Sequence, residues 1–254
     1  MTVGQWRFPP RRGAGAGAAG RSGTSGMVWE CGVVLAKYLE SARPAALRVA
    51  IAEHKVVVEL GAGTGVAGLA AAALGARVVL TDVRAALPLL DANARANAGA
   101  VEAAGGRVEA AELEWEAAAD AAAEEEGVGS AEAEAAAVGS AVGSARLPAP
   151  PAQVGLLLAA DVAYQREGRG LSALCSTVRR LAAGGGALLL AHKCRHPELD
   201  AALLQQMRDE GGMALEEVPR SHHHPDFRSL SIRLYIGSPA PPPIGGGERL
   251  GWRG

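Results

Sequence analysis

One stretch of the chain, residues 56–65, constrains the fold more than any other. It reads Val-Val-Val-Glu-Leu-Gly-Ala-Gly-Thr-Gly. The apolar start is short and rich in β-branched residues, which is typical of a strand buried on both faces of a parallel sheet. The glycines that follow let the backbone turn sharply and approach a ligand closely. The stretch therefore predicts a buried strand that ends in a binding loop.

A helix and a second strand follow this loop. Residues 66–74 are small and apolar, and they predict a helix whose first turn directs free N–H groups toward the loop. Residues 77–80 predict a strand, which is followed by Thr81 and Asp82. An acid at the tip of the second strand is the position from which the hydroxyl groups of an adenosine ribose are held. Together these elements predict a site for a cofactor that carries adenosine.

Two classes of cofactor fit the glycine pattern. Gly63, Gly65 and Gly68 match the G-x-G-x-x-G sequence of dinucleotide-binding folds, although this match is weak evidence by itself. Glu59 followed by Gly61, Gly63 and Gly65 forms the alternative pattern E-x-G-x-G-x-G. That pattern resembles the cofactor loop of class I S-adenosylmethionine-dependent methyltransferases.

The acid in the first strand favours S-adenosylmethionine. A carboxylate at Glu59 would repel the pyrophosphate of a dinucleotide in a partly dry site. S-adenosylmethionine has no phosphate and carries a sulfonium and an ammonium group, which an acid attracts. Asp82 lies about 20 residues beyond the first glycine and suits either cofactor. A second role for Glu59, hydrogen bonding to the turn, stays open and leaves the choice of cofactor unchanged.

The order of the predicted elements defines an α/β fold. Strands and helices alternate through most of the chain, which predicts a Rossmann-like, mostly parallel sheet with helices on both faces. Residues 213–218 and 229–236 predict two strands in succession. A terminal antiparallel pair of this kind closes the seven-stranded sheet of class I methyltransferases, whereas a dinucleotide fold usually continues with parallel units.

Two details of this pattern concern helix ends. A helix predicted over residues 85–98 is expected to end at Gly99, because glycine is common just after a helix. An earlier helix is predicted over residues 28–40, and Pro44 is expected in the loop that follows it. The core of the fold is then expected to begin at about Glu53.

Composition divides the chain into a domain and three low-complexity segments. We expect a methyltransferase domain at residues 27–237, interrupted by an insertion at about 117–151 that is nearly all Ala, Glu, Gly, Ser and Pro. Residues 1–26 contain arginine and no acid, and we interpret them as a disordered leader, with a transit peptide as the alternative. Residues 238–254 are rich in Pro and Gly and predict a disordered tail.

Charge and cysteine content exclude several classes of partner. The net charge of -2 gives no general basic surface for nucleic acid. No apolar run approaches the ~20 residues needed to cross a bilayer. The three cysteines are scattered, which suits a reducing compartment and gives no metal-ligand spacing. We therefore expect a cytoplasmic monomer that binds no metal, and we expect the adjacent histidines 222–224 to face solvent.

A second cluster of polar residues follows the fourth predicted strand, residues 154–160. The sequence there is Asp161-Val162-Ala163-Tyr164. In an open α/β sheet, ligands bind beyond the carboxyl ends of the strands, where the first and fourth strands are neighbours. We therefore expect Glu59, Asp82 and Asp161 to line one crevice. Lys193 and Arg195 follow the fifth strand and are expected at a solvated loop edge, with contact to the substrate as the alternative.

At this point the chain resembles the seven-β-strand protein-lysine methyltransferases, methyltransferase family 16. The resemblance covers about residues 28–236 without the insertion, and the Asp-x-x-Tyr tetrad together with two tryptophans makes it specific. The matching segments are residues 28–30, 35–40, 59–65, 86–90, 113–115 and 159–164, with Asn93 and Asn97.

The resemblance implies which residues bind S-adenosyl-L-methionine. It implies that Trp29 covers the methionine end and that Asp82 holds the ribose hydroxyls. The residues that it implies at the backbone and sides of the cofactor are Gly61, Ala62, Gly63, Trp115 and Ala160. The flat face of tryptophan suits stacking and cation contact, which agrees with this assignment.

The resemblance also implies the activity, which is methylation of a lysine side chain presented by a protein substrate. It implies Asp161 and Tyr164 as the catalytic residues that shape the lysine channel. The lysine must be neutral to attack the sulfonium methyl, yet free lysine has a pKa of ~10.4. Desolvation in a channel lowers that pKa, whereas a carboxylate raises it. We therefore expect Asp161 to orient the amine rather than to deprotonate it, and Tyr164 to exclude water.

Three other functions stay open on sequence alone. A small-molecule methyltransferase could use the same fold, because a fold does not determine its substrate. A catalytically silent module that binds a partner is a second alternative, and the intact Asp161-x-x-Tyr164 argues against it. A nicotinamide oxidoreductase is more distant, because the chain lacks a Ser-Tyr-x-x-x-Lys set or similar hydride-handling residues.

Overall fold

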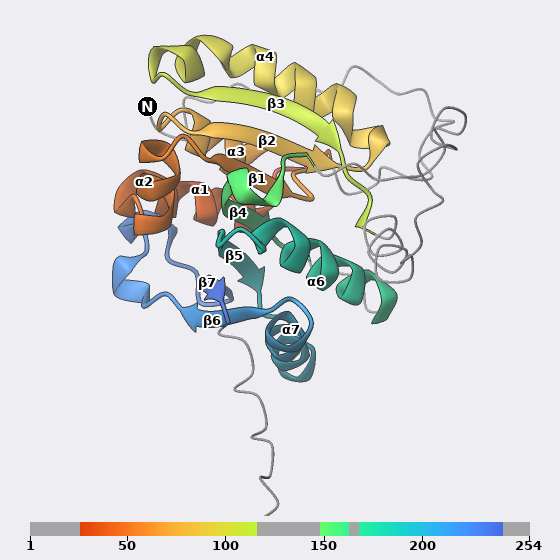
Figure 1. Ribbon diagram of the computed structural model, residues 1–254. Coiled ribbons are helices and arrows are strands. Elements are labelled where there is room, and N and C mark those ends of the chain that lie inside the picture. Colours follow the sequence, from red (N-terminus) through yellow and green to blue (C-terminus); the bar gives the residue numbers. More distant parts are fainter. Residues whose placement is uncertain (1–25, 116–147, 163–167, 241–254) are drawn as a thin grey trace, which may run out of the picture.

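The computed structural model describes residues 26–115, 148–162 and 168–240, and these residues form a seven-stranded sheet in the order β3-β2-β1-β4-β5-β7-β6 (Figure 1). Five strands are parallel, and β7 is antiparallel to both of its neighbours. The predicted α/β fold with its terminal antiparallel pair is confirmed. The strands are β1 (Val56–Leu60), β2 (Arg77–Asp82), β3 (Arg107–Glu112), β4 (Val154–Ala160), β5 (Ala187–Lys193), β6 (Met213–Glu217) and β7 (Ile232–Pro239).

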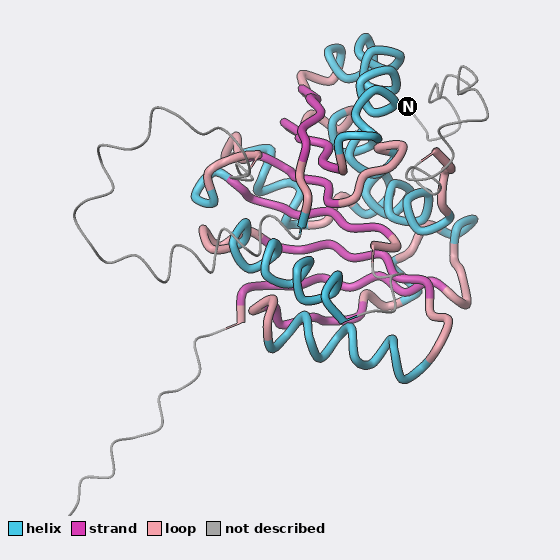
Figure 2. The backbone as a smooth tube through the Cα atoms, turned by 90° about the vertical axis from the view of Figure 1, so that its right-hand side faces the viewer, coloured by secondary structure: helices cyan, strands magenta, loops and turns pink. Residues whose placement is uncertain are grey.

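Helices cover both faces of the sheet, as the two views show (Figure 1, Figure 2). One hydrophobic cluster joins the first four helices to one face, and a second cluster joins the last two helices to the other. The helices of the first face are α1 (Glu30–Ala42), α2 (Ala45–Ala52), α3 (Val66–Ala72) and α4 (Leu87–Ala103). Those of the second are α6 (Gly168–Ala182) and α7 (Pro197–Asp209).

The central strand β1 explains this layering. All five of its residues are buried, and β2 and β4 pair with it on either side. Val57 packs in the first cluster, whereas Val56 and Val58 pack in the second. Alternate side chains of a strand point to opposite faces, so an unbroken apolar run is what a doubly covered strand requires.

Several elements differ in extent from the sequence predictions. Helix α2 was not predicted, yet it begins directly after Pro44, because proline is compatible with the start of a helix. Helix α4 continues through Gly99 to Ala103, so the predicted end at Gly99 is wrong. The last strand begins at Ile232 and ends at Pro239, later at both ends than predicted.

The register of the parallel strands brings their carboxyl ends to one edge. Glu59 pairs with Leu80 of β2 and with Leu158 of β4. Ala160 pairs with Ala191 of β5. The loops that follow β1, β2, β4 and β5 therefore start at the same level, where ligands bind in open α/β sheets.

Among the described residues, none forms a helix that is both long and apolar enough to cross a bilayer.

Helix α3 packs very closely against β1 and β2 at Gly68. A Cβ atom at this residue would lie 2.3 Å from a methyl group of Leu80 and 2.6 Å from the Glu59 carboxylate. A side chain there would push the helix away from the sheet. Gly99 provides the contrast, because a Cβ atom on it would meet nothing within 4 Å.

These two helical glycines predict opposite effects of the same substitution. Gly68→Ala should lower the free energy of unfolding by about 1–3 kcal/mol, because the added methyl group overpacks the contact of α3 with the sheet. Gly99→Ala should raise it by about 0.5–1 kcal/mol, because alanine is the better helix former. Urea denaturation followed by circular dichroism would measure both values. Equal effects of the two substitutions would contradict the close contact at Gly68.

Candidate functional site

The loop between β1 and α3 is built from glycines in a left-handed conformation. The φ angles are +58° at Gly61, +56° at Gly63 and +75° at Gly65. Side chains are disfavoured in this region of backbone space, which explains why the loop needs glycine at alternate positions. The Ala62 N–H donates a 2.9 Å hydrogen bond to the Thr81 carbonyl, so the loop is anchored to the end of β2.

Asp82 ends β2 beside the same loop. Its Oδ2 accepts a 2.7 Å hydrogen bond from the Gly63 N–H, and its Oδ1 accepts one of 2.8 Å from the Val83 N–H. Partial burial raises the pKa of this carboxyl above its ordinary value, against the lowering effect of the two N–H groups. The predicted ribose-binding acid is thus fixed against the glycine loop.

Glu59 is more deeply buried than Asp82. Its side chain is buried, and its Oε2 accepts a 2.8 Å hydrogen bond from the Gly68 N–H. This is the local role that the sequence left open, except that the donor belongs to the first turn of α3. The pKa of Glu59 is raised to about 8, chiefly by burial; the hydrogen bond from the Gly68 N–H opposes this rise, and the nearby charge of Asp82 adds to it.

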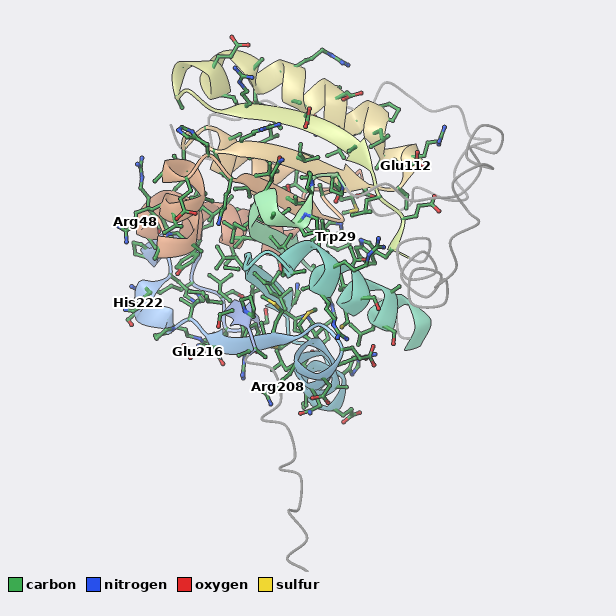
Figure 3. All side chains as sticks on the ribbon, viewed as in Figure 1. Trp29, Arg48, Glu112, Arg208, Glu216 and His222 are labelled. Carbon is green, nitrogen blue, oxygen red and sulfur yellow. The ribbon has the colours of Figure 1, made fainter. Side chains whose placement is uncertain are left out.

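Two tryptophans lie at this edge of the sheet. Trp115 is half-buried, and its ring would lie 3.2 Å from a Cβ atom at Gly61. Trp29 is 41% exposed and directly precedes α1. Trp29 is among the side chains labelled in Figure 3, and its neighbour Glu30 binds Lys193 at the end of β5. Trp115 therefore lies beside the glycine loop, and Trp29 directly precedes a residue that contacts the carboxyl edge of the sheet.

Asp161 follows β4 in a left-handed conformation with a φ angle of +57°, which is unusual for a residue other than glycine. Its N–H donates a 2.9 Å hydrogen bond to the Ala191 carbonyl of β5. This bond fixes the residue at the carboxyl edge, and its carboxylate is almost wholly buried. Ala160 precedes it and is half-buried. Strain of this kind is often found in functional sites.

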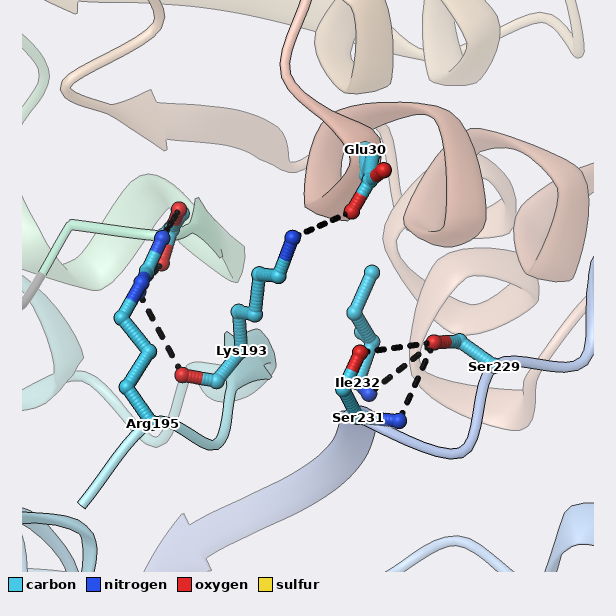
Figure 4. Close-up of polar contacts among 7 residues, drawn as sticks. Glu30, Lys193, Arg195, Ser229, Ser231 and Ile232 are labelled. Atoms are coloured by element: carbon cyan, nitrogen blue, oxygen red, sulfur yellow. Dashed lines mark hydrogen bonds and ion pairs between the residues drawn. The ribbon is translucent and has the colours of Figure 1, made fainter.

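Arg195 forms a two-point ion pair with this carboxylate. Its Nη1 and Nη2 donate hydrogen bonds of 2.7 Å and 2.6 Å to the two oxygens of Asp161. Lys193 binds Glu30 of α1 at 2.6 Å (Figure 4). Arg195 is exposed and Lys193 partly exposed, as expected at a solvated loop edge, but the sequence carried no signal of the ion pairs that they form.

The structure also places the remaining polar candidates. Asn93 of α4 is buried and donates a 2.8 Å hydrogen bond to the Thr64 carbonyl of the loop, a role that its position on the buried side of a helix could have indicated. Tyr164 lies outside the described residues. Cys31 is close to Asp161 and Arg195, and burial raises the pKa of its thiol to about 12, so it is not a reactive thiolate.

The three adjacent histidines do not behave alike. His223 is buried, with its Nε2 3.1 Å from the Val218 carbonyl, so the expectation of solvent exposure is wrong for this residue. His222 is exposed, and the ring of His224 accepts a hydrogen bond from the Asp226 N–H. Within the described ranges, no group of three or more His, Cys, Asp and Glu side chains is arranged to hold a metal ion.

The chemistry of this edge fits S-adenosylmethionine. Glu59 and Asp82 take part in none of the ion pairs found among the described residues, so positive charge on a nearby ligand would favour the ionised form of both carboxyl groups. A Cβ atom at Gly61 would lie only 3.2 Å from both Trp115 and Val162, so the loop packs closely against these two side chains. The residues present therefore suit an adenosine ligand that carries positive charge.

Comparison with known proteins identifies related chains. The model of a family described as lysine methyltransferase matches residues 17–128. The protein N-lysine methyltransferase METTL21A of Danio rerio is 30% identical over 214 residues, which are 84% of this chain and 77% of the relative. The EEF1A lysine methyltransferase 3 of Mus musculus is 36% identical over 95 residues, 37% of each chain.

Among solved structures, a TehB-like SAM-dependent methyltransferase from Corynebacterium glutamicum matches with a TM-score of 0.46 and 13% identity. The match covers 76% of this chain and 86% of that structure.

The raised pKa of Glu59 predicts a pH dependence of stability. The folded state holds this proton up to about pH 8, whereas the ordinary pKa of the free side chain is 4.5. The stabilising effect of the protonated form is therefore lost as pH rises between these two values. The free energy of unfolding of the wild type, relative to Glu59→Gln, should fall by up to ~1.4 kcal/mol per pH unit. Urea denaturation from about pH 5 to pH 8 would measure this difference.

Glu102→Gln is the matched control, because Glu102 lies exposed on α4. A difference between wild type and Glu59→Gln that stays constant with pH would contradict the raised pKa of Glu59.

Proposed function

The chain belongs to the lysine methyltransferase family, and we propose that its Asp161 orients the lysine of a protein substrate for methylation by S-adenosylmethionine. Relatives named as protein N-lysine methyltransferases favour this activity over small-molecule methylation or a silent binding module. The observation that carries the proposal is the buried carboxylate of Asp161, at the same sheet edge as the glycine loop. The protein is an S-adenosylmethionine-dependent protein-lysine methyltransferase.

We propose that the cofactor is held by the loop after β1 and by its neighbours. When bound, S-adenosylmethionine supplies an activated methyl group on a sulfonium. Asp82 would hold the ribose hydroxyls while keeping its bond to the Gly63 N–H. The other residues proposed at the cofactor are Trp29, Gly61, Ala62, Trp115 and Ala160.

The buried acid below the loop would tune this site electrostatically. Glu59 contacts the Gly68 N–H, and its high pKa leaves it largely protonated near neutral pH in the free protein. A positive charge nearby favours the ionised form of a carboxyl group and lowers its pKa. Cofactor binding is therefore expected to release a proton from Glu59, so that the carboxylate becomes negatively charged only when the cationic cofactor is bound.

Asp161 would act by position. Its buried carboxylate can accept a hydrogen bond from the incoming amine, which aligns the nitrogen. Tyr164 is proposed to flank the lysine stem and to exclude water, which would lower the pKa of the amine through desolvation. No residue is required as a general base, because a neutral amine is itself a sufficient nucleophile for an activated methyl group.

We further propose that the protein acts in a reducing compartment such as the cytoplasm, as a monomer and without nucleic acid. Cys31, Cys175 and Cys194 are free thiols, and two of them are buried. Stable disulfides are rare in cytosolic proteins, which agrees with this assignment.

Removal of the Asp161 charge should abolish transfer. Asp161→Asn is the sharper substitution, because asparagine tolerates the positive φ angle that alanine does not. Incubation with methyl-labelled S-adenosylmethionine and a cell lysate should label lysine in one or a few protein bands with the wild type. The label should fall by at least ~100-fold in the variant, since the amide is a weaker acceptor and leaves the charge of Arg195 uncompensated beside the incoming amine.

Binding of S-adenosylhomocysteine, measured by calorimetry, should remain within about threefold of wild type in Asp161→Asn. Asp209→Asn, an exposed acid of α7, is the matched control and should label lysine normally. Loss of cofactor-product binding in Asp161→Asn would assign Asp161 to the cofactor site, and label on small molecules alone would refute a protein substrate.

Trp29 is expected to contribute to cofactor binding without contributing much to stability. Trp29→Ala should weaken S-adenosylhomocysteine binding about tenfold, because an aromatic face is lost from the cation-bearing end of the ligand site. Its unfolding temperature should change little, because the side chain is 41% exposed. Leu230→Ala, which removes another exposed apolar side chain, is the control. Unchanged affinity in Trp29→Ala would remove Trp29 from the cofactor site.

A further inference from the structure

The proposed role of Asp161, which is to orient the substrate lysine, does not explain why Arg195 forms an ion pair with it. Both oxygens of the carboxylate accept hydrogen bonds from the guanidinium, at 2.7 Å and 2.6 Å. Such parallel bonds fix the plane of a carboxylate as well as its position. Each oxygen still has a second lone pair, so the pair leaves Asp161 able to accept one more hydrogen bond.

The guanidinium is itself held in place. Arg195 Nη1 also donates a 3.3 Å hydrogen bond to the Lys193 carbonyl, at the end of β5 (Figure 4). The arginine is therefore tied both to its own strand and to the loop after β4. A side chain with two anchors is suited to a permanent partner of Asp161 rather than to a mobile occupant that leaves when substrate arrives.

The other charged groups around this pair already have partners. From α1, Glu30 binds Lys193 at 2.6 Å, and Cys31 is a buried thiol whose pKa is raised to about 12. From α7, Asp200 binds His192 of β5 at 2.7 Å. Among the described residues, Arg195 is therefore the cation that directly offsets the charge of Asp161.

We propose that Arg195 is a positioning residue that neutralises Asp161, so that a lysine held by this carboxylate can lose its proton near neutral pH. The inference rests on the proposed function, because it requires the substrate amine at Asp161. An isolated carboxylate beside the amine would stabilise the ammonium form, which is unreactive. A carboxylate paired with a guanidinium remains a hydrogen-bond acceptor but presents no net charge, and arginine keeps its charge at every relevant pH.

The test is the pH profile of kcat for variants of Arg195. The probe is methyl-labelled S-adenosylmethionine with the lysate protein that the wild type labels, both at saturating concentration. The assay runs from about pH 7 to pH 10, which lies below the pKa of ~10.4 of free lysine. In Arg195→Gln the midpoint of the rising limb should move up by about one unit, so that kcat falls about tenfold at neutral pH and recovers in alkali. Arg195→Lys keeps the positive charge but lacks the two parallel N–H groups of the guanidinium, and it should retain a midpoint near that of the wild type.

Controls separate this role from a structural one. Arg233→Gln removes an exposed pair with Glu217 and should leave the profile unchanged. Thermal unfolding and S-adenosylhomocysteine binding report whether each variant is folded. An equal loss of kcat at every pH in both Arg195 variants would overturn the inference in favour of a structural role. A rise in activity of Arg195→Gln would overturn it in favour of competition between arginine and lysine.

The outcomes also distinguish the inference from the proposed function. Lysine labelling by the wild type with no shift of midpoint in Arg195→Gln overturns the inference alone. No lysine labelling by the wild type overturns both. If Arg195→Gln does not fold, Arg195→Lys decides, because a midpoint moved upward in a variant that keeps the charge contradicts neutralisation.

Discussion

The hydrogen bond from the Gly68 N–H to the Glu59 carboxylate holds the first turn of α3 against the ends of β1 and β2. It requires a residue without a Cβ atom on the helix and an acid that is buried in the strand. The glycine loop between them is then fixed at both of its ends. Asp82 and Trp115 take their positions from that loop, so the proposed cofactor site depends on one buried contact.

Two buried carboxyl groups of the site differ in whether they have a cationic partner. Glu59 has no cationic partner among the described residues, and its burial favours the protonated form. Asp161 is also buried, but a guanidinium contacts both of its oxygens. The first arrangement suits a ligand that brings positive charge, whereas the second suits a reaction in which a positive charge must be lost. The contrast follows from the partners that the fold supplies rather than from the type of residue.

The sequence was sufficient for the sheet and for most of the glycine loop, because both depend on local patterns. Apolar runs identified β1 and β4, and the alternate glycines identified the turn that their positive φ angles require. The partner of Asp161 could not be predicted, since Arg195 is 34 residues away and ordinary in its own context. Gly99 was misinterpreted because glycine commonly follows a helix, yet here the packing of Val101 on the core extends α4 beyond it.

The position of β7 has a consequence for how the chain becomes a folded molecule. β7 lies between β5 and β6 and pairs with both, although it comes last in sequence among the strands of the described residues. During synthesis β6 leaves the ribosome with no neighbour to pair with, and the free side of β5 stays open until residues 232–239 follow. Unpaired strand edges are prone to wrong association while a chain is incomplete. Pairing at this end of the sheet can therefore be completed only after β7 has been synthesised.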